Sequence, residues 1–112
     1  MKLAVIGSRK LKGIEIEEYI PDGVTEIVSG GADGVDTLAK EFANRREIPL
    51  VEFLPNYKKY GRGAPLVRNV EIAEYADEAL ALWDGRSRGA AYTIKLFQKL
   101  NKRVKIVIID EE

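Results

Sequence analysis

A glycine-rich turn at residues 29–36 carries the residue types that suit binding of an anion. The turn reads Ser-Gly-Gly-Ala-Asp-Gly-Val-Asp and lies between an apolar strand and an amphipathic helix. Glycine lets the backbone come close to a ligand, and the free N–H groups at the start of a helix attract phosphate. Asp33 is placed to cap the helix, and Asp36 lies in its first turn. These residues predict a phosphate site, and the alternative is a plain strand–helix turn without a ligand.

Two further turns have similar chemistry. Gly7-Ser8-Arg9 follows the first strand, and residues 83–89 read Trp-Asp-Gly-Arg-Ser-Arg-Gly. Five arginines lie in or beside the proposed ligand loops, as a local anion site requires, although each alone can be a solvated loop residue: Arg9, Arg62, Arg68, Arg86 and Arg88.

Composition narrows the chemistry that this chain of 112 residues can perform. It has no cysteine and no histidine, which removes thiol chemistry, cysteine-based metal sites and the commonest general base. The 18 basic and 18 acidic side chains give a net charge of zero, which argues against a general nucleic-acid binder. No apolar run is long enough for a membrane span, and the first apolar segment is too short for us to expect a signal peptide. We therefore expect a cytoplasmic protein with no membrane partner.

Apolar strands and amphipathic helices alternate along the chain. The expected strands are residues 2–6, 26–28, 50–53, 78–82 and 104–109, and their nearly continuous apolar cores are typical of a parallel sheet buried on both faces. The expected helices are residues 13–20, 35–46, 65–75 and 89–100. In the helix at 35–46, one apolar face is formed by Val35, Leu38, Ala39, Phe42 and Ala43.

This pattern predicts a single α/β domain over residues 1–112. The expected architecture is a Rossmann-like three-layer α/β/α sandwich around a five-stranded parallel sheet, with the strand order 3-2-1-4-5. Ligands of such folds bind beyond the carboxyl ends of the strands, where the strand order reverses. All three glycine turns follow strand ends, so we expect them to meet at this edge.

The connection at residues 54–64 is longer than a usual strand–helix loop. It contains Tyr57, Tyr60, Lys58, Lys59 and Arg62. The tyrosines can stack on a base while the cations meet phosphate, and the alternative is a disordered polar loop.

The order of these motifs resembles the SLOG superfamily of Rossmann-like nucleotide-binding domains. The resemblance rests on residues 7–9, 30–39, 68–69 and 76–85 and is greatest with the small YspA/YpsA-related branch. The superfamily also holds the LONELY GUY phosphoribohydrolases and the DNA-processing protein A domain, which binds single-stranded DNA. The resemblance implies nucleotide binding and a homodimer.

The chain matches the phosphoribohydrolases at one of two functional positions. Arg68 falls where those enzymes have an arginine, but Thr93 stands where they have a catalytic glutamate. Asp84 remains the best catalytic candidate; it can also bind ribose hydroxyls or a metal ion, or simply form an Asx turn. Trp83 is either a core residue or a stacking face.

We therefore expect binding of a nucleotide or nucleotide-derived ligand, such as an ADP-ribose-like molecule or a nucleoside phosphate, in a sensor role that needs no catalysis. The alternatives are hydrolysis of the N-glycosidic bond of nucleoside monophosphates and binding of single-stranded nucleic acid. No metal site or cofactor is expected, although Mg²⁺ can accompany a phosphate ligand. The expected ligand-binding residues are Gly7, Ser8, Arg9, Gly30, Gly31, Ala32, Asp33, Gly34, Asp36, Arg68, Asn69, Trp83, Asp84, Gly85, Ser87 and Gly89.

Overall fold

Five parallel strands form one sheet at the centre of the chain. The computed structural model describes residues 1–109, so residues 110–112 of the predicted domain lie outside the described part. The strands are β1 (Lys2–Gly7), β2 (Glu26–Ser29), β3 (Leu50–Glu52), β4 (Glu78–Trp83) and β5 (Arg103–Ile108). Their order is β3-β2-β1-β4-β5, which confirms the predicted order. Ala4 of β1 is paired with Val28 of β2 on one side and with Ala79 of β4 on the other.

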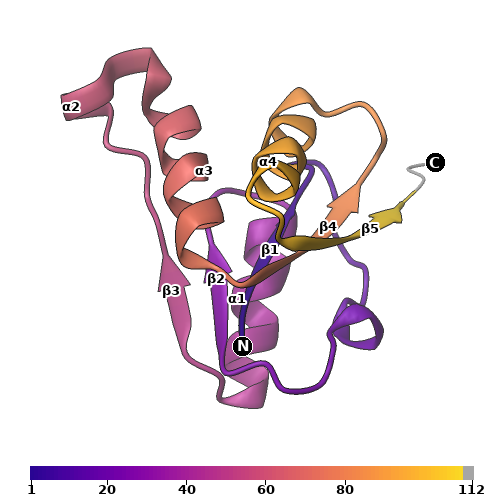
Figure 1. The fold of residues 1–112 in the computed structure, drawn as a ribbon. Coiled ribbons are helices and arrows are strands. Elements are labelled where there is room, and N and C mark those ends of the chain that lie inside the picture. The colour runs from indigo at the N-terminus through magenta and orange to yellow at the C-terminus, as the bar shows by residue number, and fades with distance from the viewer. Residues whose placement is uncertain (110–112) are drawn as a thin grey trace.

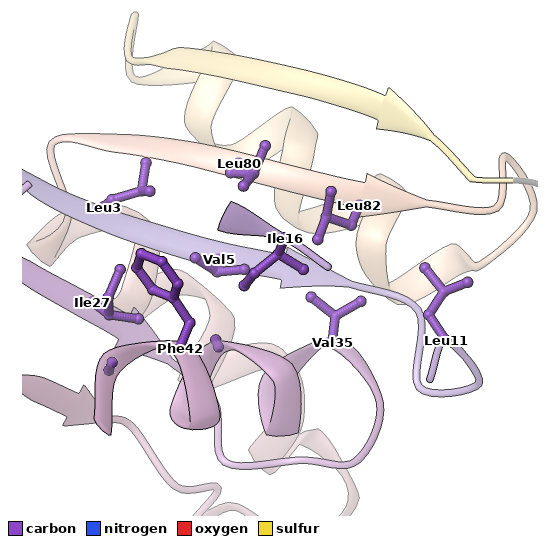
Figure 2. Packing of buried hydrophobic residues seen from close by; sticks show 11 residues of the cluster. Leu3, Val5, Leu11, Ile16, Ile27, Val35, Phe42, Leu80 and Leu82 are labelled. Carbon is purple, nitrogen blue, oxygen red and sulfur yellow. The ribbon is translucent and has the colours of Figure 1, made fainter. Parts of the chain in front are cut away.

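Helices cover both faces of the sheet, as the three-layer prediction requires (Figure 1). They are α1 (Val35–Arg46), α2 (Tyr57–Tyr60), α3 (Ala64–Tyr75) and α4 (Arg88–Lys99), with short 3₁₀ turns η1 (Glu17–Tyr19) and η2 (Gly61–Gly63). The α1 face has its own apolar core, in which Phe42 and Val35 pack with Leu3, Val5 and Leu80 of the sheet (Figure 2). A second core lies under α3 and α4 and includes Ile72, Ile94 and Phe97.

The predicted apolar face of α1 is confirmed. Val35, Ala39, Phe42 and Ala43 are buried, and Leu38 packs against the same core. The i, i+3, i+4 spacing of these residues places them on the side of the helix that faces the sheet. Every predicted strand and the helices α1, α3 and α4 agree with the structure to within one residue. Within residues 1–109, no helix is long and apolar enough to span a membrane.

The predicted helix at residues 13–20 is wrong. Residues 8–25 are irregular apart from η1, so the connection from β1 to β2 contains no α-helix. Gly13 has a φ of +67°, and the isoleucines at positions 14 and 16 are two residues apart, which puts them on different sides of a helix. Leu11 and Ile16 are nonetheless buried, so the segment packs on the sheet as an extended cover.

The strand order reverses beside β1. The chain runs outward from β1 through β2 to β3 and then returns to β4, which lies on the other side of β1. The helices that follow β2 and β4 therefore leave the sheet on opposite faces, and a crevice opens beyond the carboxyl end of β1. This crevice is where the sequence places the three glycine turns.

Candidate functional site

Ser8 joins the three turns at the carboxyl edge of the sheet. Its backbone oxygen accepts a hydrogen bond from the N–H of Val35, at 3.2 Å, and its Oγ accepts one from the N–H of Asp84, at 3.3 Å. Ser8 is buried, with 2 % of its surface exposed. The turns after β1, β2 and β4 thus lie side by side, as the parallel topology predicts.

A cavity of about 140 Å³, here named the inner cavity, opens where these turns meet α3 and α4. Ten of the sequence-predicted site residues line it: Gly7, Arg9, Gly30, Ala32, Asp33, Asp36, Arg68, Asn69, Ser87 and Gly89. Of the other residues that line it, Thr93 was named in the comparison with the phosphoribohydrolases, whereas Pro65 and Ala90, in the first turns of α3 and α4, were not predicted as site residues. Pro65 and Ala90 could have been predicted from their position, because the first turns of helices that follow parallel strands border the carboxyl edge of the sheet.

A second cavity of about 300 Å³, the outer cavity, adjoins the inner one. The two share Arg9, Gly30, Ala32, Asp33 and Arg68 in their linings. Gly31, Pro55 and Tyr57 complete the outer cavity. Tyr57 therefore lies at the site, in the place where the sequence suggested a stacking ring.

The first turn of α4 presents unpaired N–H groups at the inner cavity. Its N-cap residue, Ser87, makes no side-chain capping hydrogen bond, and the first helical bond runs from the N–H of Ala91 to the Ser87 oxygen. The N–H groups of Arg88, Gly89 and Ala90 have no partner within the helix, as at any helix start. Because Gly89 and Ala90 line the cavity, this helix end can bind an anion there.

Arg68 lies buried between α3 and the glycine turn after β2. Only 6 % of its surface is exposed, its Nη1 donates a hydrogen bond to the Gly30 oxygen, and its Nε donates one to Asn69 Oδ1 at 2.8 Å. In residues 1–109 every fully buried side-chain nitrogen or oxygen has a hydrogen-bond partner. The remaining nitrogen, Nη2, makes no hydrogen bond within this part and is therefore accessible from the cavities that Arg68 lines. Arg68 both fixes the turn and presents a positive charge.

Asp36, and not Asp33, holds the glycine turn against α1. The predicted cap by Asp33 is wrong, because the N-cap position is Gly34 and carries no side-chain hydrogen bond. The Asp36 carboxylate instead accepts a hydrogen bond from the N–H of Ala32, at 3.0 Å. Burial raises the pKa of Asp36, while the Ala32 N–H and the positive charge of Arg68 act against this rise. A carboxyl group with a raised pKa thus lines the inner cavity.

Asp84 is engaged in the turn that precedes α4. Its Oδ1 accepts hydrogen bonds from the N–H groups of Ser87 and Arg86, both at 2.8 Å, and these bonds lower the pKa of the carboxyl. Trp83 supports the same turn, since its Nε1 donates to the Ser87 oxygen at 3.0 Å. This is the Asx turn that the sequence offered as the alternative. Trp83, Asp84 and Gly85 line neither cavity, and contact of these residues with a ligand stays a prediction.

Two glycines of the site are required by close approach of the chain to itself. Gly34 has a φ of +72°, and a Cβ there would overlap the Arg9 carbonyl group. At Gly30 a Cβ would lie 2.5 Å from Arg68 Nη1. The sequence attributed these glycines to contact with a ligand, whereas in the structure they let the turns and Arg68 pack together. Neither Ser8 nor Gly34 lines the two cavities.

A larger cavity of about 670 Å³ lies on the other side of Gly34, between residues 9–16 and α1. Its walls mix Arg9, Lys12 and Arg45 with Glu15 and Glu41, and Glu15 is bonded to Arg45 at 3.2 Å. The charges there largely offset one another. The start of α1 borders this cavity through Gly34 and Thr37, but the N–H of Val35 is already bonded to the Ser8 oxygen. We place the candidate site in the inner and outer cavities because the start of α4 lines the inner cavity and Arg68 lines both. Within residues 1–109, no group of three or more His, Cys, Asp or Glu side chains could hold a metal ion.

Comparison with known proteins gives one family. The model of the YspA, cpYpsA-related SLOG family matches residues 15–60, which include the glycine turn, α1 and Tyr57. Neither the curated proteins nor the solved structures contain a match to the chain. The matched segment and the Rossmann-like sheet support the resemblance to the YspA-like branch of the SLOG superfamily that was drawn from the motifs.

Proposed function

We propose that the chain binds a nucleotide or a nucleotide-derived ligand at the carboxyl edge of its sheet. The observation that carries the proposal is the meeting of the free α4 N-terminus with Arg68 and Arg9 around the inner cavity. A helix start attracts the negative charge of a phosphate, and a guanidinium group can bind two of its oxygens. The similarity of residues 15–60 to the YspA, cpYpsA-related SLOG family supports a nucleotide as the source of that phosphate.

The two cavities suit different parts of such a ligand. Sites that enclose a drug-sized ligand have volumes of roughly 300–1,000 Å³, so the inner cavity of about 140 Å³ suits a phosphate and part of a sugar. The outer cavity of about 300 Å³ has room for a base or a second sugar, with Tyr57 as a wall. An ADP-ribose-like molecule or a nucleoside phosphate has this division of charge and apolar surface.

Binding without turnover agrees with the residues around the cavity. Thr93, which takes the place of a catalytic glutamate, is buried and its hydroxyl donates to the Gly89 oxygen at 3.0 Å. Asp84 is held by two backbone N–H groups. Neither side chain is free to transfer a proton to a ligand in the inner cavity, which supports a sensor role.

Calorimetric titration with AMP and ADP-ribose tests the proposal. We expect at least one saturable signal, and we expect Arg9→Ala to weaken it about 10- to 100-fold, the usual contribution of a charged hydrogen bond. Arg9 is exposed, so its loss should leave the melting temperature unchanged. Arg103→Ala, at the start of β5 and at the opposite edge, is the matched control and should bind normally. Absence of binding by every nucleotide would overturn the proposal.

One observation favours a second candidate function, hydrolysis of the N-glycosidic bond of a nucleoside monophosphate. Asp36 lines the inner cavity, and burial raises its pKa above the ordinary value, the direction in which general acids and bases are shifted. In such an enzyme Asp36 would give a proton to the leaving base or take one from the attacking water. Asp84, whose pKa is lowered, is less suited to either task.

Release of ribose 5-phosphate from AMP decides between the two functions. Nucleotide binding without release supports the sensor role. Release that falls about 10²- to 10⁴-fold in Asp36→Asn but persists in Asp84→Asn would identify an enzyme with Asp36 as its proton-transfer group.

A further inference from the structure

Residues 54–63, here named the arm, carry aromatic rings that the fold does not bury. The arm contains α2 and η2 and lies at an outer corner of the molecule, between β3 and α3 (Figure 1). Tyr57 is 58 % exposed and Tyr60 is 42 % exposed. Of the eight large hydrophobic side chains that are exposed in residues 1–109, four lie on the arm or just after it: Leu54, Tyr57, Tyr60 and Leu66. Such a cluster in one place is typical of a binding surface.

The arm is strongly positive although the whole chain is neutral. Residues 53–70 contain no aspartate and no glutamate, while Lys58, Lys59 and Arg62 alternate with the two tyrosines and Arg68 follows in α3. All three arm cations are exposed. Positive side chains interleaved with aromatic rings bind phosphate-linked bases, because the rings stack on the bases and the cations neutralise the phosphates.

The arm is continuous with the candidate site. Tyr57 and Pro55 line the outer cavity together with Arg68. Lys59 Nζ lies 5.2 Å from the centre of the Tyr60 ring, so a positive charge accompanies the ring that lies farther along the arm. A ligand that leaves the inner cavity through the outer one therefore meets Tyr57 first and the remaining rings and cations next.

We propose that the arm binds a second nucleotide unit, so that the ligand of this site is a phosphate-linked dinucleotide and not a mononucleotide. This inference rests on the proposed function and adds the class of ligand to it. The first unit takes the inner and outer cavities, the base of the second unit stacks on Tyr60, and Lys58, Lys59 and Arg62 lie beside the linking phosphates. Two sources share this chemistry, namely a pyrophosphate-linked dinucleotide and the 5′ end of a phosphodiester-linked strand.

Titration with three ligands under one salt condition tests the inference. AMP represents one unit, NAD represents two units joined by pyrophosphate, and the 5′-phosphorylated dinucleotide pApA represents two units joined by a phosphodiester. Base stacking on one aromatic ring typically changes affinity about 5- to 100-fold. We expect NAD or pApA to bind at least about tenfold more tightly than AMP, and the tighter of the two identifies the linkage.

Matched variants assign the gain to the arm. Tyr60→Leu, at a tyrosine that is 42 % exposed and lines neither cavity, or Lys58→Ala combined with Lys59→Ala, should remove the advantage of the dinucleotide and leave AMP binding within about twofold. Tyr92→Leu, at a tyrosine of α4 that is 36 % exposed, and Lys95→Ala combined with Lys99→Ala are the controls and should keep the advantage. All these positions are exposed, so we expect every variant to fold.

The outcomes separate this inference from the function on which it rests. Equal affinities for AMP, NAD and pApA, or a dinucleotide advantage that survives both arm variants, would overturn the inference and leave nucleotide binding in place. Absence of binding by all three ligands would overturn both.

Discussion

Replacement of Arg68 by alanine should lower both stability and affinity, and the structure sets the size of the first effect. The Nη1 group of Arg68 satisfies the buried Gly30 oxygen, and an unpaired buried carbonyl costs about 1–3 kcal/mol. The bond to the adjacent Asn69 and the lost packing of the side chain add to this cost. We therefore expect a loss of about 2–4 kcal/mol, or roughly 10 °C in the melting temperature.

The loss should depend on pH because Arg68 interacts with Asp36. Burial holds the pKa of Asp36 above its ordinary value of 3.8, so ionisation of Asp36 reduces stability as the pH rises through its folded-state pKa. The charge of Arg68 partly offsets this reduction, and its removal should raise the pKa of Asp36 further. The deficit of Arg68→Ala should therefore be largest near neutral pH and shrink as the pH falls toward 3.8.

Urea unfolding at pH 7 and near pH 4 measures both effects. Arg45→Ala is the control, because Arg45 makes an exposed ion pair with Glu15 and its side chain is 52 % exposed. A deficit for Arg68→Ala as small as that of the control would show that Arg68 does not hold the glycine turn. An equal deficit at the two pH values would contradict its coupling to Asp36.

Three further predictions concern the framework of the site. Lys102→Met should lower the free energy of unfolding by about 1–3 kcal/mol in urea unfolding, because Lys102 Nζ donates to the oxygens of Ala73, Glu74 and Ala76 at 2.7–2.9 Å and caps the end of α3; Lys95→Met should change little. Gly34→Ala should cost at least about 2 kcal/mol in the same assay, because φ is +72° and the Arg9 carbonyl is too close; a smaller cost would show that the two turns can move apart. Asp84→Ala should reduce stability at neutral pH but not below the lowered folded-state pKa of Asp84, since a carboxyl with a lowered pKa stabilises the fold only while it is ionised; a loss that is independent of pH in thermal melts from pH 2 to 7 would contradict this.

The sequence predicted most of the fold because its local signals agreed with one another. The apolar cores of β1 and β4 are buried together in the parallel sheet, and the apolar stripe of α1 determined that helix over its whole length. The expected burial of β5 on both faces is wrong, because β5 is an edge strand and its Ile106 and Ile108 are exposed. The meeting of the three turns at one edge could then be predicted from the parallel topology alone, because it does not depend on side-chain contacts. The segment at residues 13–20 could not be predicted, because Leu11 and Ile16 are buried by tertiary packing and not by helical periodicity.

The candidate site was predicted in position but not in the roles of its residues. Asp33 and Asp36 are equally suited by sequence to contact the start of α1, and only the path of the turn shows that Asp36 accepts the Ala32 N–H. The sequence predicted that Gly30 and Gly34 contact a ligand. In the structure a side chain at Gly30 would collide with Arg68, which is far away in the sequence, and one at Gly34 would collide with the Arg9 carbonyl in another turn. The local excess of positive charge on the arm could not be predicted from the net charge of zero, because the net charge does not say where along the chain the charges lie.

The binding of a phosphate at the start of α4 is the central claim, and backbone amide NMR shifts test it most directly. Uniformly ¹⁵N-labelled protein is titrated with AMP, and the amides are followed residue by residue. We expect saturable shifts at Gly89 and Ala90 and at Gly30 and Ala32, which line the inner cavity from two sides. No saturable shift, or shifts confined to the larger cavity around Lys12 and Glu41, would contradict the assignment of the site.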